Sequence, residues 1–274
     1  MTPIKQITKK ELAKKLGVSR SSLYYHHKLP AKDKALKELI ELTLTKHPEY
    51  GHKRLALELQ INKKRILRVM NKCGIKPRRR RVQRPKKLDD QGNLPSKFPN
   101  VYKLWCPLIP GVLWAGDFTY FYFQGKFYYL ATFIDVCTRE IVGCHIASNH
   151  SYDYLIHKAL DDALEKHPSP LWSHTDQGAE YTSASYAQRC YHEGIQISMS
   201  DKGSPWQNGF QESFYGKFKV SLGRLDQFES LGELVAAIHQ TLYYYNHKRI
   251  HTSLKMSPIR YKQLLTTTSD RLRV

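Results

Sequence analysis

The sequence predicts an α/β protein in which a mixed β-sheet with flanking helices follows an all-helical N-terminal part. Residues 112–123, 126–135 and 139–147 are strand-like runs rich in aromatic and β-branched residues, and short turns separate them. From residue 151 onward, helical and strand patterns alternate, over 151–167, 171–174, 183–193 and 195–200. The first 75 residues instead carry apolar residues at helical spacing.

Positive charge is concentrated in the N-terminal part of the chain. Residues 1–100 carry 27 Lys and Arg against 8 Asp and Glu, whereas residues 101–274 carry 17 against 16. A basic arm on a nearly neutral globular half indicates a polyanionic partner, most simply nucleic acid. A general role in solubility would not explain why the charge is segregated. With 41% hydrophobic residues, the 274-residue chain can form a core without disulfides.

The five cysteines and the hydropathy pattern indicate a compartment. No C-x-x-C pair is present, so the cysteines are expected to be reduced thiols. The sequence has no apolar run of transmembrane length and no signal peptide at its N-terminus. We therefore expect a cytoplasmic protein with no membrane partner.

Residues 7–27 predict a helix-turn-helix. Thr8 and Glu11 form a capping box that opens the first helix, Gly17 ends it, and Ser19 can cap the second. Polar residues at the start of the second helix suit a DNA major groove; they are Arg20, Ser21 and Ser22. The alternative is an ordinary helical hairpin whose polar residues are solvated.

A further amphipathic helix over residues 32–46 and a second helical pair over 48–75 complete the N-terminal part. Asn62 is the expected N-cap of the last helix and Gly74 its end. Its outer face is basic and has almost no acidic partners in the sequence, so we expect phosphate contacts from Lys63, Lys64, Arg65 and Arg68. The predicted domains are residues 1–75 for DNA binding, 76–100 as a basic linker, and 101–274 as a core with a C-terminal helical extension. The linker is poor in apolar residues and contains the run Arg78, Arg79, Arg80 and Arg81.

Three acidic residues are the candidates for chemistry. Asp117 lies in a strand-like run, Asp176 at the end of a short strand, and Glu212 on a helix with an aromatic stripe expected to be core. There are 58 residues between the first two acids and 35 between the last two. Two carboxylates on strands and one on a helix can converge on Mg²⁺, which prefers oxygen ligands. Paired metal ions can assist both the attacking and the leaving oxygen in phosphodiester displacement.

Other polar residues of the core have simpler explanations. Asp135 and Glu140 are expected at the surface or in turns, and Asp201 is expected to begin a turn. His174 can be a packing residue, because hard cations prefer oxygen to imidazole nitrogen.

The segments around the three acids resemble those of a known family. Insertion-sequence transposases of the retroviral-integrase superfamily carry segments similar to WAGDFTY at Asp117, YLATFIDVCTREIVG, HTDQGAEY at Asp176, SPWQNGFQESFYGKFK at Glu212, and YYNHKRIHTSLKMSPIRY. The resemblance is greatest to the OrfB product of bacterial elements with two reading frames. It covers nearly the whole chain, with residues 101–262 similar to the catalytic core. It implies a ribonuclease-H-like fold in which the three acids hold two Mg²⁺ ions, with Mn²⁺ possible.

The resemblance also implies further site residues. Lys219, two helical turns after Glu212, matches the basic residue that the family places against DNA phosphate, and Gly216 leaves that helix face open. Five residues are expected to line the site: His174, Gln177, Lys202, Ser204 and Asn208. Of these, Lys202 and Asn208 are expected to contact DNA. Contacts with DNA at the far end of the core are expected from His247, Lys248, Arg249 and His251. The His and Cys spacing of a zinc module is absent, so no zinc is expected.

The implied reaction is transposition of double-stranded DNA. Water attacks a phosphodiester at the element end and frees a 3′-OH, which then attacks a target phosphodiester, with no covalent protein–DNA intermediate. Joining two ends implies a homo-oligomer. The lack of a leucine heptad run suggests that an OrfA-type partner or fusion completes the enzyme. Two alternatives remain, a ribonuclease-H-like nuclease and a catalytically silent DNA-binding regulator.

Overall fold

The computed structural model describes residues 8–24, 29–79, 98–101, 107–148 and 152–271. The chain begins with α1 (Lys9–Lys15), and the side chains of Thr8 and Glu11 form the expected capping box at its start. After the turn at Gly17, a 3₁₀ helix η1 (Arg20–Tyr24) takes the place of the expected second α-helix. The hydroxyl of Ser19 lies 2.8 Å from both the Ser21 and the Ser22 hydroxyls and caps this short turn.

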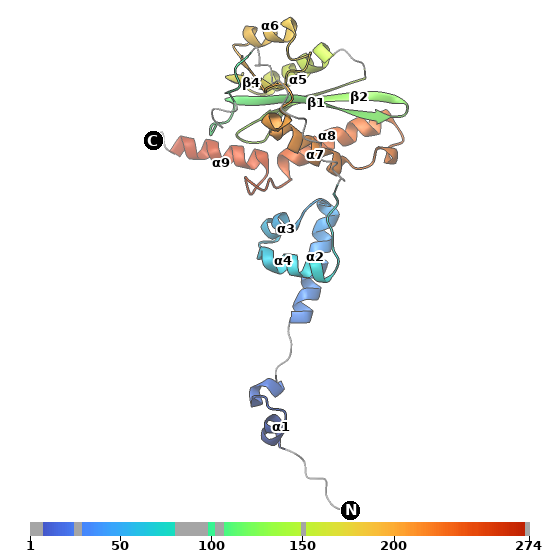
Figure 1. The fold of residues 1–274 in the computed structure, drawn as a ribbon, viewed down its shortest axis with the longest axis vertical. Helices are drawn as coiled ribbons and strands as arrows, with labels where there is room; N and C mark the ends of the chain where they lie inside the picture. The colour runs from blue at the N-terminus through green and yellow to red at the C-terminus, as the bar shows by residue number, and fades with distance from the viewer. Residues whose placement is uncertain (1–7, 25–28, 80–97, 102–106, 149–151, 272–274) are drawn as a thin grey trace, which may run out of the picture.

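Three helices form a separate bundle, shown in blue to cyan in Figure 1. They are α2 (Leu29–Lys46), α3 (His52–Leu59) and α4 (Lys63–Lys72). The Asn62 side chain accepts from the Lys64 N–H at 2.9 Å, which confirms the expected N-cap of α4. Apolar residues at helical spacing close a small core, consisting of Leu36, Ile40, Tyr50, Leu55, Ile66, Val69 and Met70.

The C-terminal part is built on a five-stranded sheet with the order β3-β2-β1-β4-β5. Its strands are β1 (Leu113–Phe123), β2 (Lys126–Asp135), β3 (Ile141–Ala147), β4 (Trp172–Thr175) and β5 (Gln196–Met199). The first three strands form an antiparallel meander, and β4 and β5 add to β1 in parallel. This arrangement confirms the predicted mixed sheet.

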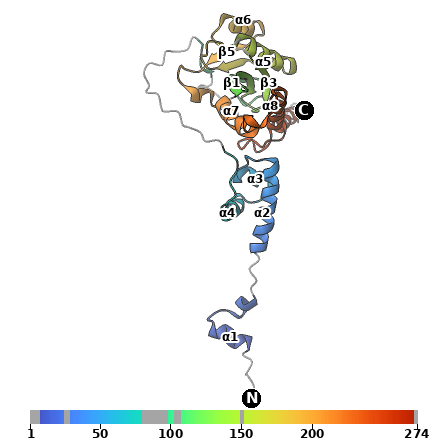
Figure 2. The same cartoon turned by 90° about the vertical axis from the view of Figure 1, so that its right-hand side faces the viewer.

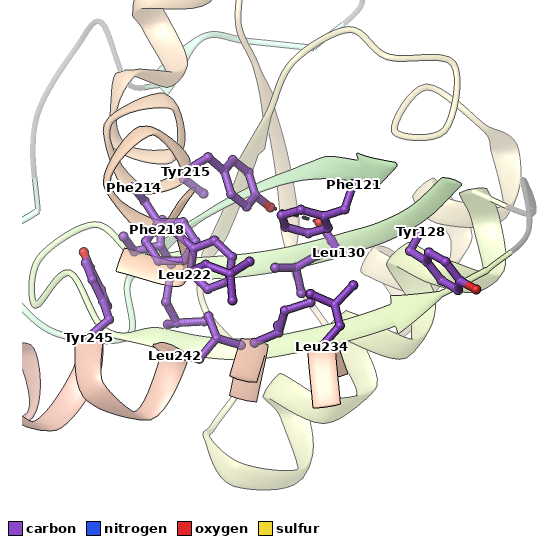
Figure 3. Packing of buried hydrophobic residues seen from close by; sticks show 14 of the residues in the cluster. Phe121, Tyr128, Leu130, Phe214, Tyr215, Phe218, Leu222, Leu234, Leu242 and Tyr245 are labelled. Carbon is purple, nitrogen blue, oxygen red and sulfur yellow. Dashed lines mark hydrogen bonds between the residues drawn. The ribbon is translucent and has the colours of Figure 1, made fainter. Parts of the chain in front are cut away.

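Helices cover both faces of the sheet (Figures 1 and 2). One face carries α5 (Tyr152–Lys166) and α6 (Ala184–His192) over the core that includes Trp114, Phe133 and Leu160. The other face carries α7 (Gly209–Leu222) and α8 (Leu231–His247), whose aromatic and leucine side chains pack on β1 and β2 (Figure 3). The alternation of side chains along β1 divides its residues between these two cores. Odd-numbered residues of β1, and therefore Asp117, belong to the α7 face.

Shorter elements and one long helix connect and extend this core. The 3₁₀ helix η3 (Pro205–Asn208) leads directly into α7, and η4 (Leu225–Gln227) lies between α7 and α8. After α8, the helix α9 (Pro258–Arg271) extends the C-terminal part of the chain and packs against α8. Among the described helices, none combines the length and apolarity needed to cross a bilayer.

Gly143 in β3 explains how closely α5 approaches the sheet. A Cβ atom at this position would lie 2.4 Å from the Ala159 carbonyl oxygen and 2.5 Å from the Ala163 methyl group. Backbone and Cβ atoms cannot move aside as the end of a flexible side chain can. A glycine on the strand and alanines on the helix therefore set the spacing of this layer.

The helical bundle docks on the end of α8 through polar and aromatic contacts. The imidazole of His47 lies 2.7 Å from the Tyr244 hydroxyl, and the buried Tyr50 hydroxyl accepts from the Ile250 N–H at 2.8 Å. Glu49 forms an ion pair with the buried Arg249. Each contact joins residues about 200 positions apart in sequence, so the bundle and the core meet at one defined junction.

Candidate active site

Asp117 and Asp176 lie side by side on adjacent parallel strands. The register pairs Leu113 with Trp172 and Ala115 with His174, so Asp117 and Asp176 each lie two residues beyond the last pair. Neighbouring strands are about 4.8 Å apart, which places the two residues next to each other where β4 ends. The Asp176 carboxylate accepts from the Gly178 N–H at 3.0 Å, and that of Asp117 from the Phe118 N–H at 2.8 Å.

The start of α7 is fixed to β1 beside these acids. The Asn208 amide donates to the Gly116 carbonyl at 3.1 Å, and the Gln211 amide donates to the Ala115 and Thr132 carbonyls at 2.5 and 2.9 Å. One turn later, the Tyr215 hydroxyl donates to the Asp117 carbonyl at 2.7 Å. These bonds hold the first turns of α7 over the strand, and Glu212 lies exposed in the first turn.

The acids interact electrostatically. Burial raises the pKa of Asp117 to about 8, and the Asp176 carboxylate adds to the shift; Glu212 and Glu180 contribute less, and the Phe118 N–H opposes it. A carboxyl group beside like charges without a compensating cation shows this behaviour. The site therefore has an excess of negative charge at the end of β4.

The donor chemistry of this group suits a hard divalent cation, because all the nearby acidic groups supply carboxylate oxygens. The arrangement, however, is open: among the described residues, no three His, Cys, Asp or Glu side chains are gathered closely enough to hold a metal ion. Asp117 and Asp176 are adjacent, whereas Glu212 is exposed on the helix above them. The three acids therefore have the right ligand atoms for a divalent cation, but only Asp117 and Asp176 lie next to each other.

Comparisons with known proteins agree with this arrangement. Residues 107–205 and residues 193–258 each match an integrase core domain family. The chain is 32% identical over 270 residues to the putative transposase InsK for insertion sequence element IS150 of Escherichia coli, covering 92% of each chain. It is 33% identical to the transposase for insertion sequence element IS904 of Lactococcus lactis, covering 83% of this chain and 94% of that protein.

The chain belongs to the insertion-sequence transposases of the integrase-core family. It is therefore a polynucleotidyl transferase, as its sequence predicted, and nothing in the comparisons favours the nuclease or regulator alternative. A chain of the simian T-cell lymphotropic virus intasome in complex with PP2A regulatory subunit B56 gamma has the same fold, with a TM-score of 0.51 and 19% identity, over 81% of this chain and 73% of that chain. The predicted ribonuclease-H-like architecture is confirmed.

Lys219 of the transposase lies on the same face of α7 as Glu212 and is half-buried. Between them, Gly216 is exposed, and a Cβ atom there would meet no atom within 4 Å, so this helix face is open. The Lys219 ammonium lies 3.4 Å from the Tyr120 carbonyl oxygen and about 5.5 Å from the Tyr120 ring centroid. It lines a pocket of about 480 Å³ together with Tyr122 and Leu225.

The other residues expected to line the site differ in accessibility. Lys202 is exposed in the turn after β5, and the Gln177 amide donates to the Ser200 carbonyl at 3.0 Å. His174 is buried between the Ser198 and Ser200 hydroxyls, and burial lowers its pKa to about 4, so the imidazole is neutral. Ser204 is also buried. His174 thus has the packing role that the sequence analysis offered as its alternative.

Most basic residues predicted to bind DNA are exposed in the N-terminal part. The predicted DNA-binding residues with exposed side chains in this part are Arg20, Ser21, Ser22, Lys63, Lys64, Arg65, Arg68, Arg78 and Arg79, whereas Arg80 and Arg81 lie outside the described residues. Arg68 corrects an assumption of the sequence analysis. Both of its terminal nitrogens bond to the buried Asp33 carboxylate, at 2.8 and 2.6 Å, and Lys72 joins at 3.3 Å. Asp33 comes from α2, so its pairing with α4 was invisible in local sequence.

Two residues expected at DNA lie inside the fold instead. Asn208 is 5% exposed and bonds to β1, and Arg249 is 1% exposed and paired with Glu49. Neither side chain reaches the surface: Asn208 holds the start of α7 on β1, and Arg249 joins the core to the helical bundle. Lys248, between exposed His247 and buried Arg249, is exposed.

Asp135 and Glu140 are buried and not at the surface, which corrects a second expectation. The Asp135 carboxylate accepts from the Thr138 N–H at 2.6 Å and the Gly111 N–H at 2.6 Å, so it does organise the β2–β3 turn. The Glu140 carboxylate accepts from the Lys262 ammonium of α9 at 2.8 Å. This ion pair depends on a helix more than 100 residues away, and no local pattern could have indicated it.

Sequence reasoning also missed Gln211 and Tyr215, which hold α7 in place. Gln211 is fully buried next to exposed Glu212, and its oxygen accepts from the Thr132 hydroxyl at 3.1 Å. The only signal in the sequence was a glutamine directly before a candidate ligand, because its burial cannot be read from the sequence. The aromatic residues of α7 were instead predicted to form its buried face, and Phe214 and Phe218 do belong to the core.

Proposed function

We propose that this transposase cuts DNA at the ends of its insertion sequence and joins the freed ends to target DNA, with Asp117, Asp176 and Glu212 as its catalytic residues. The observation that carries the proposal is the register of β1 and β4, which makes Asp117 and Asp176 neighbours under a helix that bears Glu212. The raised pKa of Asp117 supports it, because the Asp176 and Glu212 carboxylates add to the shift that burial produces.

The three carboxylates would hold Mg²⁺, or Mn²⁺ in its place, as two ions. When bound, the metal ions supply electrostatic stabilisation to the attacking and leaving oxygens of a phosphodiester. Asp117 and Asp176 are adjacent already, and Glu212 would close over them from its exposed position on α7. The anchoring of α7 by Gln211 and Tyr215 restricts this closure to movement of the Glu212 side chain.

Two displacements at phosphorus account for the reaction. In the first, a water oxygen bonds to phosphorus and the P–O bond to the 3′ oxygen breaks, leaving a 3′-OH on the element end. In the second, that 3′ oxygen bonds to a target phosphorus and the P–O bond to the target's own 3′ oxygen breaks, so that the proton lost by the attacking hydroxyl is balanced by the one gained by the leaving oxygen. No covalent intermediate with the protein is needed. The chain's contribution is to position the phosphates, for which Lys219 on the open face of α7 is suited.

The remaining parts of the chain would bind double-stranded DNA. We assign residues 1–75 to DNA binding, 76–100 to a basic linker and 101–274 to the catalytic core with its helical extension. The exposed basic side chains of α4 and η1 support the first assignment. Synapsis of two ends calls for a homo-oligomer, and an OrfA-type partner is part of the proposal. Exposed Leu12, Leu16 and Leu42 on N-terminal helices are available for such an association.

The test is incubation of the purified full chain with labelled element-end DNA and Mg²⁺ or Mn²⁺, beside the variant Glu212→Gln. We expect nicked and joined products that require the metal and vanish in the variant. Cleavage of DNA without joining, even with an OrfA-type protein added, would support a nuclease. Binding of element-end DNA with no metal-dependent product under the same conditions would leave a DNA-binding regulator.

A further inference from the structure

A second pocket lies on the side of α7 away from the acidic residues. It encloses about 290 Å³ between the start of α7, the β2–β3 turn and the segment after α8. Phe214 and Tyr245 form part of its wall, and both are visible in Figure 3. Three basic side chains also line it: Arg139 from the turn, Lys217 from α7 and His251 from the C-terminal segment.

Two guanidinium groups, those of Arg249 and Arg54, lie near the basic side chains that line the pocket. Arg249 is 1% exposed, and Arg54 comes from α3 of the helical bundle. Their positive charges, with that of Arg139, lower the pKa values of His251 and Lys217 further than burial alone does. Basic groups from four separate stretches of the chain therefore line this pocket or lie near it.

Among the described residues, one carboxylate is paired with Arg249, and three of the other basic groups have no ion-pair partner. The Glu49 carboxylate pairs with Nε of Arg249, and no ion pair between described residues reaches Arg54, Lys217 or His251. Buried charges are costly unless they are paired, because the interior screens them poorly. An arrangement with several cations and one carboxylate is consistent with an anionic ligand.

Hydrogen-bond donors remain unused in the same place. Both terminal nitrogens of Arg249, Nε of Arg54 and Nδ1 of His251 are buried and make no hydrogen bond within the described structure. Buried polar groups are bonded in the great majority of cases, and unsatisfied donors indicate a missing partner. Guanidinium groups are well suited to the tetrahedral oxygens of phosphate.

Backbone geometry places Arg139 in this pocket at an energetic cost. Arg139 has a φ of 66°, in the left-handed region that residues other than glycine rarely adopt. The guanidinium consequently lies 3.6 Å from the centroid of the Phe210 ring, at the start of α7. A strained turn that directs an arginine into a pocket is typical of a ligand site.

We propose that the pocket lined by Arg139, Lys217 and His251 binds a phosphate group, which neutralises the cations gathered where the helical bundle meets the catalytic core. A backbone phosphate of bound DNA is the source that fits a transposase, and a free phosphate-bearing molecule has the same chemistry. The site differs from the acidic one and does not require the metal. Its existence can be tested independently of cleavage.

The experiment measures thermal unfolding and calorimetric binding of the full chain in sodium phosphate, sodium pyrophosphate or sodium chloride at matched ionic strength. We expect saturable stabilisation by phosphate and pyrophosphate over chloride. Lys217→Gln, a mild change on a helix, should weaken phosphate binding about tenfold, and Arg139→Gln should do the same. Lys126→Gln removes an equal charge from the exposed β1–β2 hairpin and should leave phosphate affinity unchanged.

A DNA arm identifies the source of the phosphate. If protein saturated with double-stranded DNA no longer responds to inorganic phosphate, the pocket holds a DNA phosphate; if it still responds, the ligand is a free phosphate-bearing molecule. Either result supports the anion site. Equal stabilisation by phosphate and chloride, or equal phosphate affinity in the wild type and a correctly folded Lys217→Gln, would overturn it. Failure of DNA cleavage would leave these readouts untouched.

Discussion

Asp117 and Asp176 occupy equivalent positions on neighbouring parallel strands, each two residues beyond the pair formed by Ala115 and His174. β1 continues past this point to Phe123, whereas β4 ends at Thr175. One carboxylate is therefore anchored within a long strand while the other stands at a strand end, free of further pairing. Because the two carboxylates are neighbours, the charge of Asp176 adds to the rise in the pKa of Asp117 that burial produces.

Removing either strand carboxylate should abolish catalysis without unfolding the protein. Asp176→Asn is nearly isosteric and lies at an exposed strand end, so we expect cleavage and joining to fall by at least about 100-fold. Affinity for element-end DNA, measured in the absence of metal, should be kept. Glu165→Gln on α5, exposed on the opposite face of the sheet, is the matched control and should retain wild-type rates. Wild-type turnover by Asp176→Asn would remove Asp176 from the catalytic set.

The raised pKa of Asp117 predicts a pH-dependent stability. The folded, metal-free chain keeps this proton up to about pH 8, whereas an aspartic acid in the unfolded chain loses it near about pH 4. The folded state binds more protons across this window, so stability falls as pH rises through it. Asp117→Asn removes the effect, and we expect the variant to exceed the wild type by about 1–2 kcal/mol near pH 9, after allowance for solvent screening.

The corresponding measurement is thermal unfolding from acidic to alkaline pH in the presence of a chelator. The Tm of Asp117→Asn should exceed that of the wild type by about 3–6 °C at the alkaline end, and the two values should converge near about pH 4. Added Mg²⁺ should raise the Tm of the wild type more than that of the variant. A Tm difference that stays constant with pH would contradict the assignment of the shift to Asp117.

Lys219 is expected to act through a DNA phosphate. Lys219→Gln removes one positive charge from the open face of α7, so DNA affinity should fall and the slope of log affinity against log salt should decrease by about 1. Fluorescence anisotropy with element-end DNA over a range of salt concentrations measures both quantities. Lys126→Gln serves as the charge-matched control. An unchanged salt slope would show that Lys219 makes no phosphate contact.

The spacing between α5 and β3 depends on Gly143. Gly143→Ala places a methyl group against the Ala159 carbonyl oxygen and the Ala163 side chain, and we expect a loss of about 3 kcal/mol in the free energy of unfolding. Gly216→Ala is the contrasting change, since its methyl group would meet no atom within 4 Å on an exposed helix turn. That variant should gain up to about 1 kcal/mol. Urea unfolding compares the two, and similar values would refute the packing argument.

Docking of the helical bundle relies on the Tyr50 hydroxyl. Tyr50→Phe leaves the Ile250 N–H without its 2.8 Å acceptor in a buried setting, and should cost about 1–2 kcal/mol of unfolding free energy. Tyr243→Phe, at an exposed position on α8, is the control and should have little effect. Chemical denaturation measures both variants. If Tyr50→Phe matched the control, the bundle would be held by its other contacts alone.

Local sequence patterns predicted much of the fold because they depend on interactions between residues that are close in sequence. The capping box at Thr8, the Asn62 cap and the alternation of β1 and β2 all arise from neighbours in sequence, and the structure confirms them. The second helix of the first pair was predicted as an α-helix and is a five-residue 3₁₀ turn. Ser19, Ser21 and Ser22 supply hydroxyls that bond to one another, but no residue of this turn is buried, so no apolar face extends it into a longer helix.

The sequence by itself determined the fold class, the family and the three acids with their spacing, because periodicity and the order of motifs can be recognised without knowing which residues are in contact. Only the tertiary structure decided which charged side chains are paired or buried. Arg68 is paired with Asp33, Arg249 lies buried against Glu49, and Glu140 bonds to Lys262. Each of these pairs joins residues at least 35 positions apart. Burial and pairing depend on which elements meet in space, and a one-dimensional pattern does not contain that information.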